Sequence, residues 1–143
     1  MTPEDKSLLK TTWAMVAPIA DVAAGLFYER LFTLDPSLKP MFAKSDMKEQ
    51  RRKLMLAIGG VINGVDNLEA LVPTLEQLGR NHARYGVIDR HYETVAAALL
   101  WTLEQGLKDA WTPAAKSAWT AAYTTVATVM RSAASAQASE RAA

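Results

Sequence analysis

The fold is indicated most clearly by residues 71–86, LVPTLEQLGRNHARYG. Three leucines recur there at the spacing of one helical face: Leu71, Leu75 and Leu78. Pro73 and Gly86 are residue types typical of the first turn and the end of a helix. His82 continues the leucine face, so its ring is expected to point inward. Two interpretations remain open here, a core histidine bonded to a carbonyl and a metal ligand.

The same helical period recurs on both sides of this stretch. One helix is expected to open at Thr2-Pro3, and others to cover about residues 21–34, 48–65, 73–84, the stretch from Asp89, and the stretch after Thr112-Pro113. Pro36 can start a short helix, and residues 39–47 are expected to form a loop. Asp89 is a candidate helix cap. The pattern predicts an all-α fold of six or seven helices.

Composition limits the classes of function. The chain has 143 residues and a formal net charge of +1, so one domain is expected and charge gives no argument for a nucleic-acid or membrane partner. It has no cysteine, which excludes disulfides, iron–sulfur clusters and covalent haem attachment through C-x-x-C-H. The N-terminus lacks the apolar core of a signal peptide, and no stretch reaches the length of a membrane span, so a cytoplasmic protein is expected.

Two further polar residues lie on otherwise apolar helical faces. Tyr28 stands in an aromatic group with Phe27 and Phe32, and it is either a core tyrosine or a hydroxyl directed into a cavity. Gln50 precedes Leu54 by one turn on the longest amphipathic helix. It is either an exposed first-turn residue or a hydrogen-bond donor at the mouth of a pocket.

The other histidine, His91, follows His82 by nine residues at the start of the next helix. We expect it to be a solvated surface residue. A zinc site is excluded as an interpretation of His82, because the chain offers no second histidine at ligand spacing on a helix.

Taken together, these residues resemble a bacterial single-domain globin, of the group that includes Vitreoscilla-type haemoglobin and the haem domain of flavohaemoglobins. The resemblance runs from about residue 5 to 131. Its motifs are FYERLF (27–32), DP (35–36), MF (41–42), QRRKL (50–54), LGRNHARYGV (78–87), HYETV (91–95) and AWTAAY (118–123). It implies a globin fold around a buried haem, a globin domain at 1–132 and a frayed tail at 133–143.

The resemblance also implies roles for single residues. His82 would be the proximal iron ligand of a non-covalently bound haem b, and Tyr28 and Gln50, with Leu54, would face the bound ligand. The haem would be walled by Phe42, Leu54, Leu78, Val87, Val95 and Leu99. Tyr92 matches a family tyrosine that hydrogen-bonds near the proximal histidine.

The implied function is reversible, high-affinity binding of O2, NO or CO. Tyr28 and Gln50 are donors that would stabilise negative charge on bound O2 in a dry pocket. The alternative is an NO dioxygenase or peroxidase-like enzyme working with a separate reductase. In the flavohaemoglobin pattern an acid on the last helix joins the proximal histidine, but the matching position here is Ala134. This absence favours O2 binding, and a haem-free scaffold is the third hypothesis.

Overall fold

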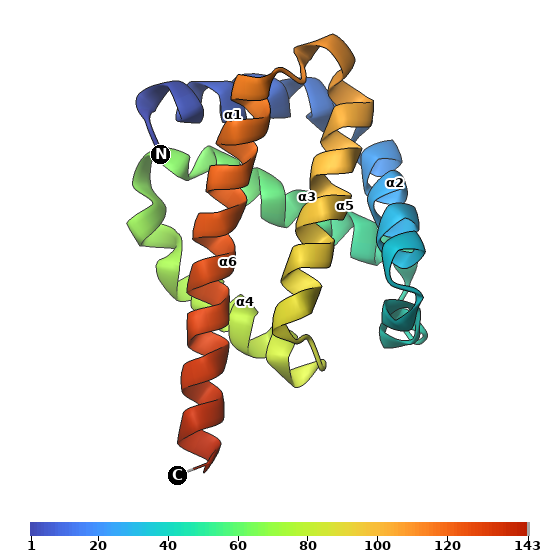
Figure 1. The fold of residues 1–143 in the computed structure, drawn as a ribbon, viewed down its shortest axis with the longest axis vertical. Coiled ribbons are helices and arrows are strands. Elements are labelled where there is room, and N and C mark those ends of the chain that lie inside the picture. Colours follow the sequence, from blue (N-terminus) through green and yellow to red (C-terminus); the bar gives the residue numbers. More distant parts are fainter. Residues whose placement is uncertain (143) are drawn as a thin grey trace.

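The computed structural model describes the backbone of residues 1–142 and the side chains of residues 1–139. Its regular elements are all helical, which confirms the predicted fold class (Figure 1). In chain order they are α1 (Pro3–Val16), η1 (Ala17–Ile19), α2 (Ala20–Leu34), η2 (Pro36–Phe42), α3 (Met47–Asn63), η3 (Val65–Leu71), α4 (Val72–Arg84), α5 (Asp89–Leu107), η4 (Lys108–Ala110) and α6 (Pro113–Ala142).

The long C-terminal helix organises the packing. Helix α6 lies against α1, α4 and α5, while α2 lies against α3 and α5. Figure 1 shows α5 and α6 side by side, with α1 crossing them at one end and the α4–α5 turn at the other. The main core forms where α1, α3, α5 and α6 meet, around Leu9, Ile62, Leu103 and Trp119. There the indole Nε1 of Trp119 donates to the Thr12 hydroxyl at 2.9 Å, so a buried polar pair joins α1 to α6.

Side-chain caps explain where several helices begin. The Thr2 hydroxyl accepts from the Asp5 backbone N–H, and the Asp5 carboxylate accepts from the Thr2 backbone N–H. Asp46 accepts from two backbone N–H groups at the start of α3, and Thr112 accepts from the Ala115 N–H at the start of α6. Asp89 is not a cap, because it is already the first residue of α5 and Ile88 is the capping position.

The segment expected to be a loop is partly helical. Helix η2 extends to Phe42, so the loop prediction is wrong for residues 39–42. Asp35 starts this helix by accepting from the Ser37 N–H, and a 3-10 helix accommodates Pro40 near its end. The remaining residues of the connection, 43–46, lead directly into α3.

Helix α6 continues to Ala142 through the segment predicted to be frayed. Ala133 is buried against the rest of the chain, and the end of the predicted tail, Ala143, lies outside the described residues. The boundary of the domain at residue 132 stays a prediction. Among the described residues, no single helix is long and apolar enough to cross a membrane; only Met47–Asn63 and Val65–Arg84 together meet that test, with a 111° bend between them.

Candidate functional site

The ring of His82, on helix α4, makes one hydrogen bond to the backbone. The ring Nδ1 lies 2.7 Å from the carbonyl oxygen of Leu78, one turn earlier on the same helix. A carbonyl can only accept, so Nδ1 carries a proton, and in the neutral ring Nε2 is the nitrogen that has the lone pair. The ring is only partly buried. The carbonyl bond of the first interpretation is present, and it leaves the other ring nitrogen available, so iron ligation by His82 stays a prediction.

The place of α4 in the fold depends on a residue that sequence reasoning missed. Gly79 lies against α6 so closely that a Cβ atom there would stand 2.1 Å from the Met130 carbonyl oxygen. Only glycine permits this approach of two backbones. The feature of the sequence that could have indicated this close contact is a glycine inside an otherwise strong helical pattern, three residues before His82.

A mixed aromatic and aliphatic cluster on α2, η2, α3 and α5 forms one wall of the candidate site, and we call it the distal cluster. Its buried members include Phe27, Tyr28 and Ala98. Partly buried residues pack on them, and these include four that were predicted to line the site: Phe42, Leu54, Val95 and Leu99. Helices far apart in sequence thus bring the predicted wall residues to one place.

The aromatic rings of the distal cluster hold Tyr28 firmly. Its ring meets Phe27 edge-on at 5.1 Å between centroids and Phe42 edge-on at 5.5 Å. Phe32 lies 6.1 Å away on another side. Edge-to-face pairs of this kind fix ring orientation as well as burying apolar area.

Tyr28 and Gln50 are in contact. Burial raises the pKa of the Tyr28 hydroxyl above its usual value, and a hydrogen bond with the Gln50 side chain lowers it by a smaller amount. Gln50 of α3 thus approaches the Tyr28 hydroxyl of α2, and both side chains can donate a hydrogen bond. Because its pKa is raised, the Tyr28 hydroxyl stays protonated at neutral pH.

A second cluster, which we call the proximal cluster, lies on α4, α5 and α6. Its buried members are Leu75, Tyr92, Ala127 and Met130. Leu78 and Val87, both predicted to line the site, pack against them while staying partly exposed. The proximal cluster therefore joins the two aliphatic neighbours of His82 to α6.

Tyr92 is bound to α6 rather than to the histidine. The Tyr123 hydroxyl donates to the Tyr92 carbonyl oxygen at 2.6 Å, and the Arg131 guanidinium lies 5.7 Å from the centre of the Tyr92 ring. Burial raises the pKa of Tyr92, while Arg131 lowers it and Asp89 raises it. The hydrogen bonds of residues 1–139 include none between Tyr92 and His82, so the expected contact of this tyrosine stays a prediction.

An acid does approach Tyr92, although the sequence places none near Ala134. Asp89, at the start of α5, pairs with Arg131 at 3.2 Å between Oδ1 and Nε. Asp89 stands on α5 itself, three residues before Tyr92, and Arg131 reaches it from α6.

His91 is buried, with 7% of its surface exposed, so the prediction of a solvated residue is wrong. Its Nδ1 accepts from the Ile88 backbone N–H at 3.0 Å and thereby caps α5. The side chain turns back over the helix start, because that N–H has no partner within the helix. Asp35, at the end of α2, is close enough that His91 lowers its pKa, after the larger effect of its hydrogen bond to Ser37.

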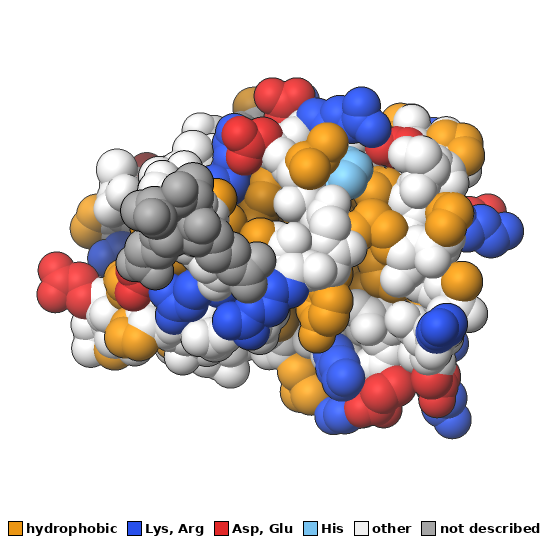
Figure 2. Space-filling view, turned by 90° about the horizontal axis from the view of Figure 1, so that it is seen from below, with side chains coloured by type: hydrophobic (Ala, Val, Ile, Leu, Met, Phe, Trp, Pro, Cys, Tyr) orange, Lys and Arg blue, Asp and Glu red, His pale blue; other side chains and the backbone are white. Residues whose placement is uncertain are grey.

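The distal cluster reaches the α4–α5 turn through Met41. A Cβ atom at Gly86 would lie 3.8 Å from the Met41 methyl group, which places η2 beside this turn. Gly86 has φ of +93°, a conformation that favours glycine and ends α4 as predicted. Figure 2 shows hydrophobic side chains and one histidine exposed together on this face.

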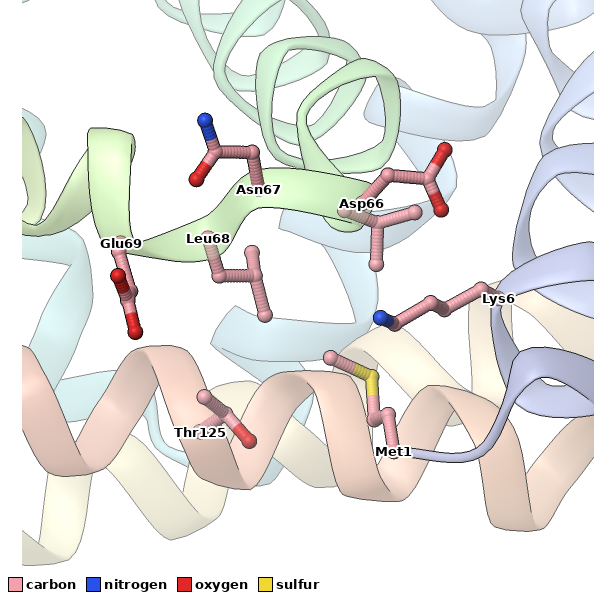
Figure 3. Close-up of a pocket in the computed structure, with 8 residues that line it drawn as sticks. Met1, Lys6, Asp66, Asn67, Leu68, Glu69 and Thr125 are labelled. Atoms are coloured by element: carbon pink, nitrogen blue, oxygen red, sulfur yellow. The ribbon is translucent and has the colours of Figure 1, made fainter.

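Elsewhere, the structure has a surface crevice of about 430 Å³ between the N-terminus, η3 and α6 (Figure 3). It is lined by mixed polar and apolar side chains, among them Lys6, Asp66 and Thr125. None of the predicted site residues lies in it. Among the described residues there is no group of three or more His, Asp or Glu side chains placed to hold a metal ion.

Comparison with known proteins gives a consistent result. The Globin family model matches residues 25–130. A flavohemoprotein of Vibrio cholerae is 32% identical over 86% of this chain, and one of Bacillus subtilis is 30% identical over 84%. Neuroglobin of Danio rerio is 28% identical over 91% of this chain and 90% of its own length. The chain spans about a third of the length of the two flavohemoproteins.

Proposed function

Because the chain belongs to the globin family, we propose that it is a haem protein that binds O2 reversibly, with His82 as the iron ligand. The observation that carries this proposal is the hydrogen bond of His82. With Nδ1 bonded to the Leu78 carbonyl oxygen at 2.7 Å, Nε2 is the nitrogen that the neutral imidazole would offer to a metal. A neutral, oriented imidazole is the ligand that haem iron takes in this family.

Family membership implies a haem held without a covalent bond, and the residues present fit such a group. Six predicted wall residues are apolar yet only partly buried by protein: Phe42, Leu54, Leu78, Val87, Val95 and Leu99. They belong to both clusters, and Val87 stands in the α4–α5 turn itself. A flat apolar group between the clusters would cover side chains that otherwise meet water.

The iron of a haem supplies a coordination position for a diatomic gas. On the other side of the site, Tyr28 is the residue best placed to act on that gas. Its hydroxyl is buried and protonated, and the Gln50 side chain lies beside it. Its own proton is thus available to a ligand that carries partial negative charge. Gln50 acts chiefly by orienting this hydroxyl.

This arrangement favours tight binding and slow release. A hydrogen bond to a charged group contributes roughly 1.5–3 kcal/mol, and about 1.4 kcal/mol corresponds to a tenfold change in rate or affinity. We therefore propose O2 affinity too high for efficient unloading in transport. Scavenging or sensing in the cytoplasm suits these properties better, and CO and NO are expected to bind at the same position.

NO dioxygenase activity with a separate reductase is the second function considered. It would require repeated turnover, because a single reaction of the O2-bound protein with NO needs no enzyme. The arrangement around Tyr92 favours simple binding, since Arg131 balances the acid there and Tyr92 contacts α6. Nitrate production over many turnovers with added reductant would favour the enzyme instead.

Visible absorption spectra test the proposal directly. The purified protein is expected to show a haem Soret band that shifts between its ferric, reduced and O2-exposed forms. His82→Ala should change or lose this band, and added free imidazole should restore it by taking the place of the missing ring. A purified protein without a Soret band, or a His82→Ala variant with an unchanged reduced spectrum, would contradict the proposal.

A further inference from the structure

Helix α2 leaves a row of apolar side chains on the surface. Val22, Leu26 and Arg30 follow one another at intervals of four residues, so they lie along one side of the helix. Val22 is 63% exposed, and Leu26 is only partly buried. Ile19 before the helix and Leu34 at its end are also exposed. A row of exposed apolar side chains, as opposed to scattered single ones, marks a contact site.

Helix α5 carries a second row of surface side chains. Ala97, Trp101 and Gln105 also stand four residues apart, and Trp101 is only partly buried while the other two are exposed. Neither Trp101 nor Leu26 belongs to the main core, the distal cluster or the proximal cluster of the described residues. Two large apolar side chains are therefore left over when this chain packs its own core.

Two contacts bring these rows together in space. The Ile19 Cδ1 lies 3.8 Å from the place of a Cβ atom at Gly106, and the Arg30 guanidinium carbon lies 4.9 Å from the centre of the Trp101 ring. Later residues of α2 thus meet earlier residues of α5, so the two helices run antiparallel, with α2 at one edge of the molecule in Figure 1. We call the shared surface the α2–α5 face: Val22, Leu26, Arg30, Ala97 and Trp101.

Arg30 joins the two rows but its charge is not balanced. Its Nε is buried and has no hydrogen-bond partner among the described residues. The ion pairs found in that part of the chain do not include Arg30. A buried donor without an acceptor is costly, so a balancing group is expected from outside the chain. Tryptophan and arginine are also the residue types enriched at the centres of protein–protein contacts.

Two carboxylates border the same face. Glu29 stands two turns after Val22 on α2, and Glu104 stands two turns after Ala97 on α5, so each shares the side of its helix that carries the face. Both side chains are exposed, and the ion pairs of the described residues include neither. The α2–α5 face therefore combines apolar area with free charges of both signs.

We propose that the α2–α5 face is the contact surface of a homodimer with two-fold symmetry. In such a dimer each copy presents the same surface, so the Arg30 guanidinium of either copy meets carboxylates of the other. Val22, Leu26 and Trp101 lose their contact with water in the same step. The inference does not depend on the proposed haem function, because Tyr28 belongs to the buried side of α2.

The mixture of charges favours a second copy over a partner of one sign. An acidic protein or a nucleic acid would bring negative charge to Glu29 and Glu104, and a basic protein would bring positive charge to Arg30. A surface that meets its own copy needs both signs, because each charged group must find its counterpart on an identical surface.

Sedimentation velocity of the purified full chain, at concentrations from about 1 to 200 µM, tests the dimer by mass action. The wild type should pass from monomer to dimer over this range. Val22→Glu should raise the dimer Kd at least about tenfold, because it places a carboxylate in the apolar part of the contact. The matched control is Leu56→Glu on α3, where the leucine is 60% exposed, and it should leave Kd within about twofold of the wild type.

Charge reversal tests whether both copies use this face. Arg30→Glu makes all three charges of the face negative, and Glu29→Arg with Glu104→Arg makes them all positive. Each variant alone should dimerise at least about tenfold more weakly, because like charges meet. Mixed in equal amounts, the two variants should form a heterodimer with Kd within about threefold of the wild type, because opposite charges meet again. A fluorophore on one variant identifies the heterodimer.

A wild type that stays monomeric throughout the concentration range, equal effects of Val22→Glu and Leu56→Glu, or a mixture without heterodimer would overturn the proposal. Binding of a monomeric wild type to phosphatidylglycerol vesicles, lost in Val22→Glu, would assign the face to a membrane surface instead. Urea denaturation shows whether each variant is folded. If Arg30→Glu fails to fold, the comparison of Val22→Glu with Leu56→Glu, both at exposed positions, decides the question.

Discussion

Gly79 of α4 packs directly on Met130 of α6, where an added Cβ atom would stand 2.1 Å from the Met130 carbonyl oxygen and 2.6 Å from its Cα. Backbone atoms cannot move aside as a flexible side chain can. The position of His82, one turn along α4, thus depends on the absence of a side chain at residue 79. This contact connects the packing of the last helix to the geometry of the candidate iron ligand.

Gly79→Ala is expected to lower the free energy of unfolding by about 1–3 kcal/mol, the usual cost of overpacking, despite the better helix propensity of alanine. Urea denaturation measures the change. Gly60→Ala on α3 is the matched control, because nothing lies within 4 Å of an added Cβ there. The control should be more stable by up to about 1 kcal/mol. A stable Gly79→Ala protein with an unchanged Soret band would contradict the close packing.

The two histidines should separate in their effects. His82→Ala should change the haem spectrum with little change in the stability of the haem-free protein, because its ring is partly exposed and bonds only a carbonyl of its own helix. His91→Ala should retain the spectrum but lower the free energy of unfolding by about 1–2 kcal/mol, as expected for loss of a helix cap. Spectra and urea denaturation of both variants decide this. The reverse pattern would exchange the two roles.

Tyr28→Phe should raise the O2 dissociation rate by about 10- to 100-fold, because it removes the donor hydroxyl. Gln50→Leu should raise the rate by a smaller factor, since it removes the group that orients that hydroxyl. In the double variant the two effects should not add, because both changes break one hydrogen-bond chain. Stopped-flow mixing with CO or another trapping ligand measures the rates.

Gln77→Leu, on the exposed surface of α4, is the control for this series and should leave O2 release unchanged. Additive effects of Tyr28→Phe and Gln50→Leu would show that Gln50 acts on the ligand separately. No effect from either variant would remove both residues from the ligand site.

Tyr123 gives the protein a specific response to alkaline pH. Burial, and to a smaller extent the neighbouring Tyr92, raise the pKa of its hydroxyl well above the ordinary value of 10.0. At pH values between the unfolded and the folded pKa, the Tyr123 hydroxyl of the folded protein therefore keeps its proton while that of the unfolded chain has lost it. Its contribution to stability is complete below pH 10 and is lost as the pH rises toward the folded pKa, at up to about 1.4 kcal/mol per pH unit.

Tyr123→Phe should lower stability by about 1 kcal/mol at pH 8, where the hydrogen bond to the Tyr92 carbonyl is lost. Between pH 10 and 11.5 the variant should lose less stability than the wild type. Urea denaturation across this range tests both statements, and Tyr85→Phe, at a 74% exposed residue, is the control. Parallel pH profiles for wild type and Tyr123→Phe would contradict the assigned burial.

Local sequence signals predicted the helices well because they arise within a few residues of chain. The helical period, the Thr2 cap and the positive φ of Gly86 all depend on neighbours at most four positions away. The same reasoning was wrong for His91, since a histidine at a helix start is usually exposed. It predicted a short helix starting at Pro36 but missed its continuation through residues 39–42.

The sequence by itself determined the helical elements, the absence of cysteine chemistry and the set of polar residues that lie on apolar helical faces. These follow from side-chain type and helical period, which any reader of the chain can evaluate. Only the tertiary structure decided that Gln50 approaches Tyr28, that Asp89 pairs with Arg131, and that Gly79 permits α4 to approach α6. Such contacts join residues 22 to 51 positions apart, and the energy that selects them comes from packing the whole chain.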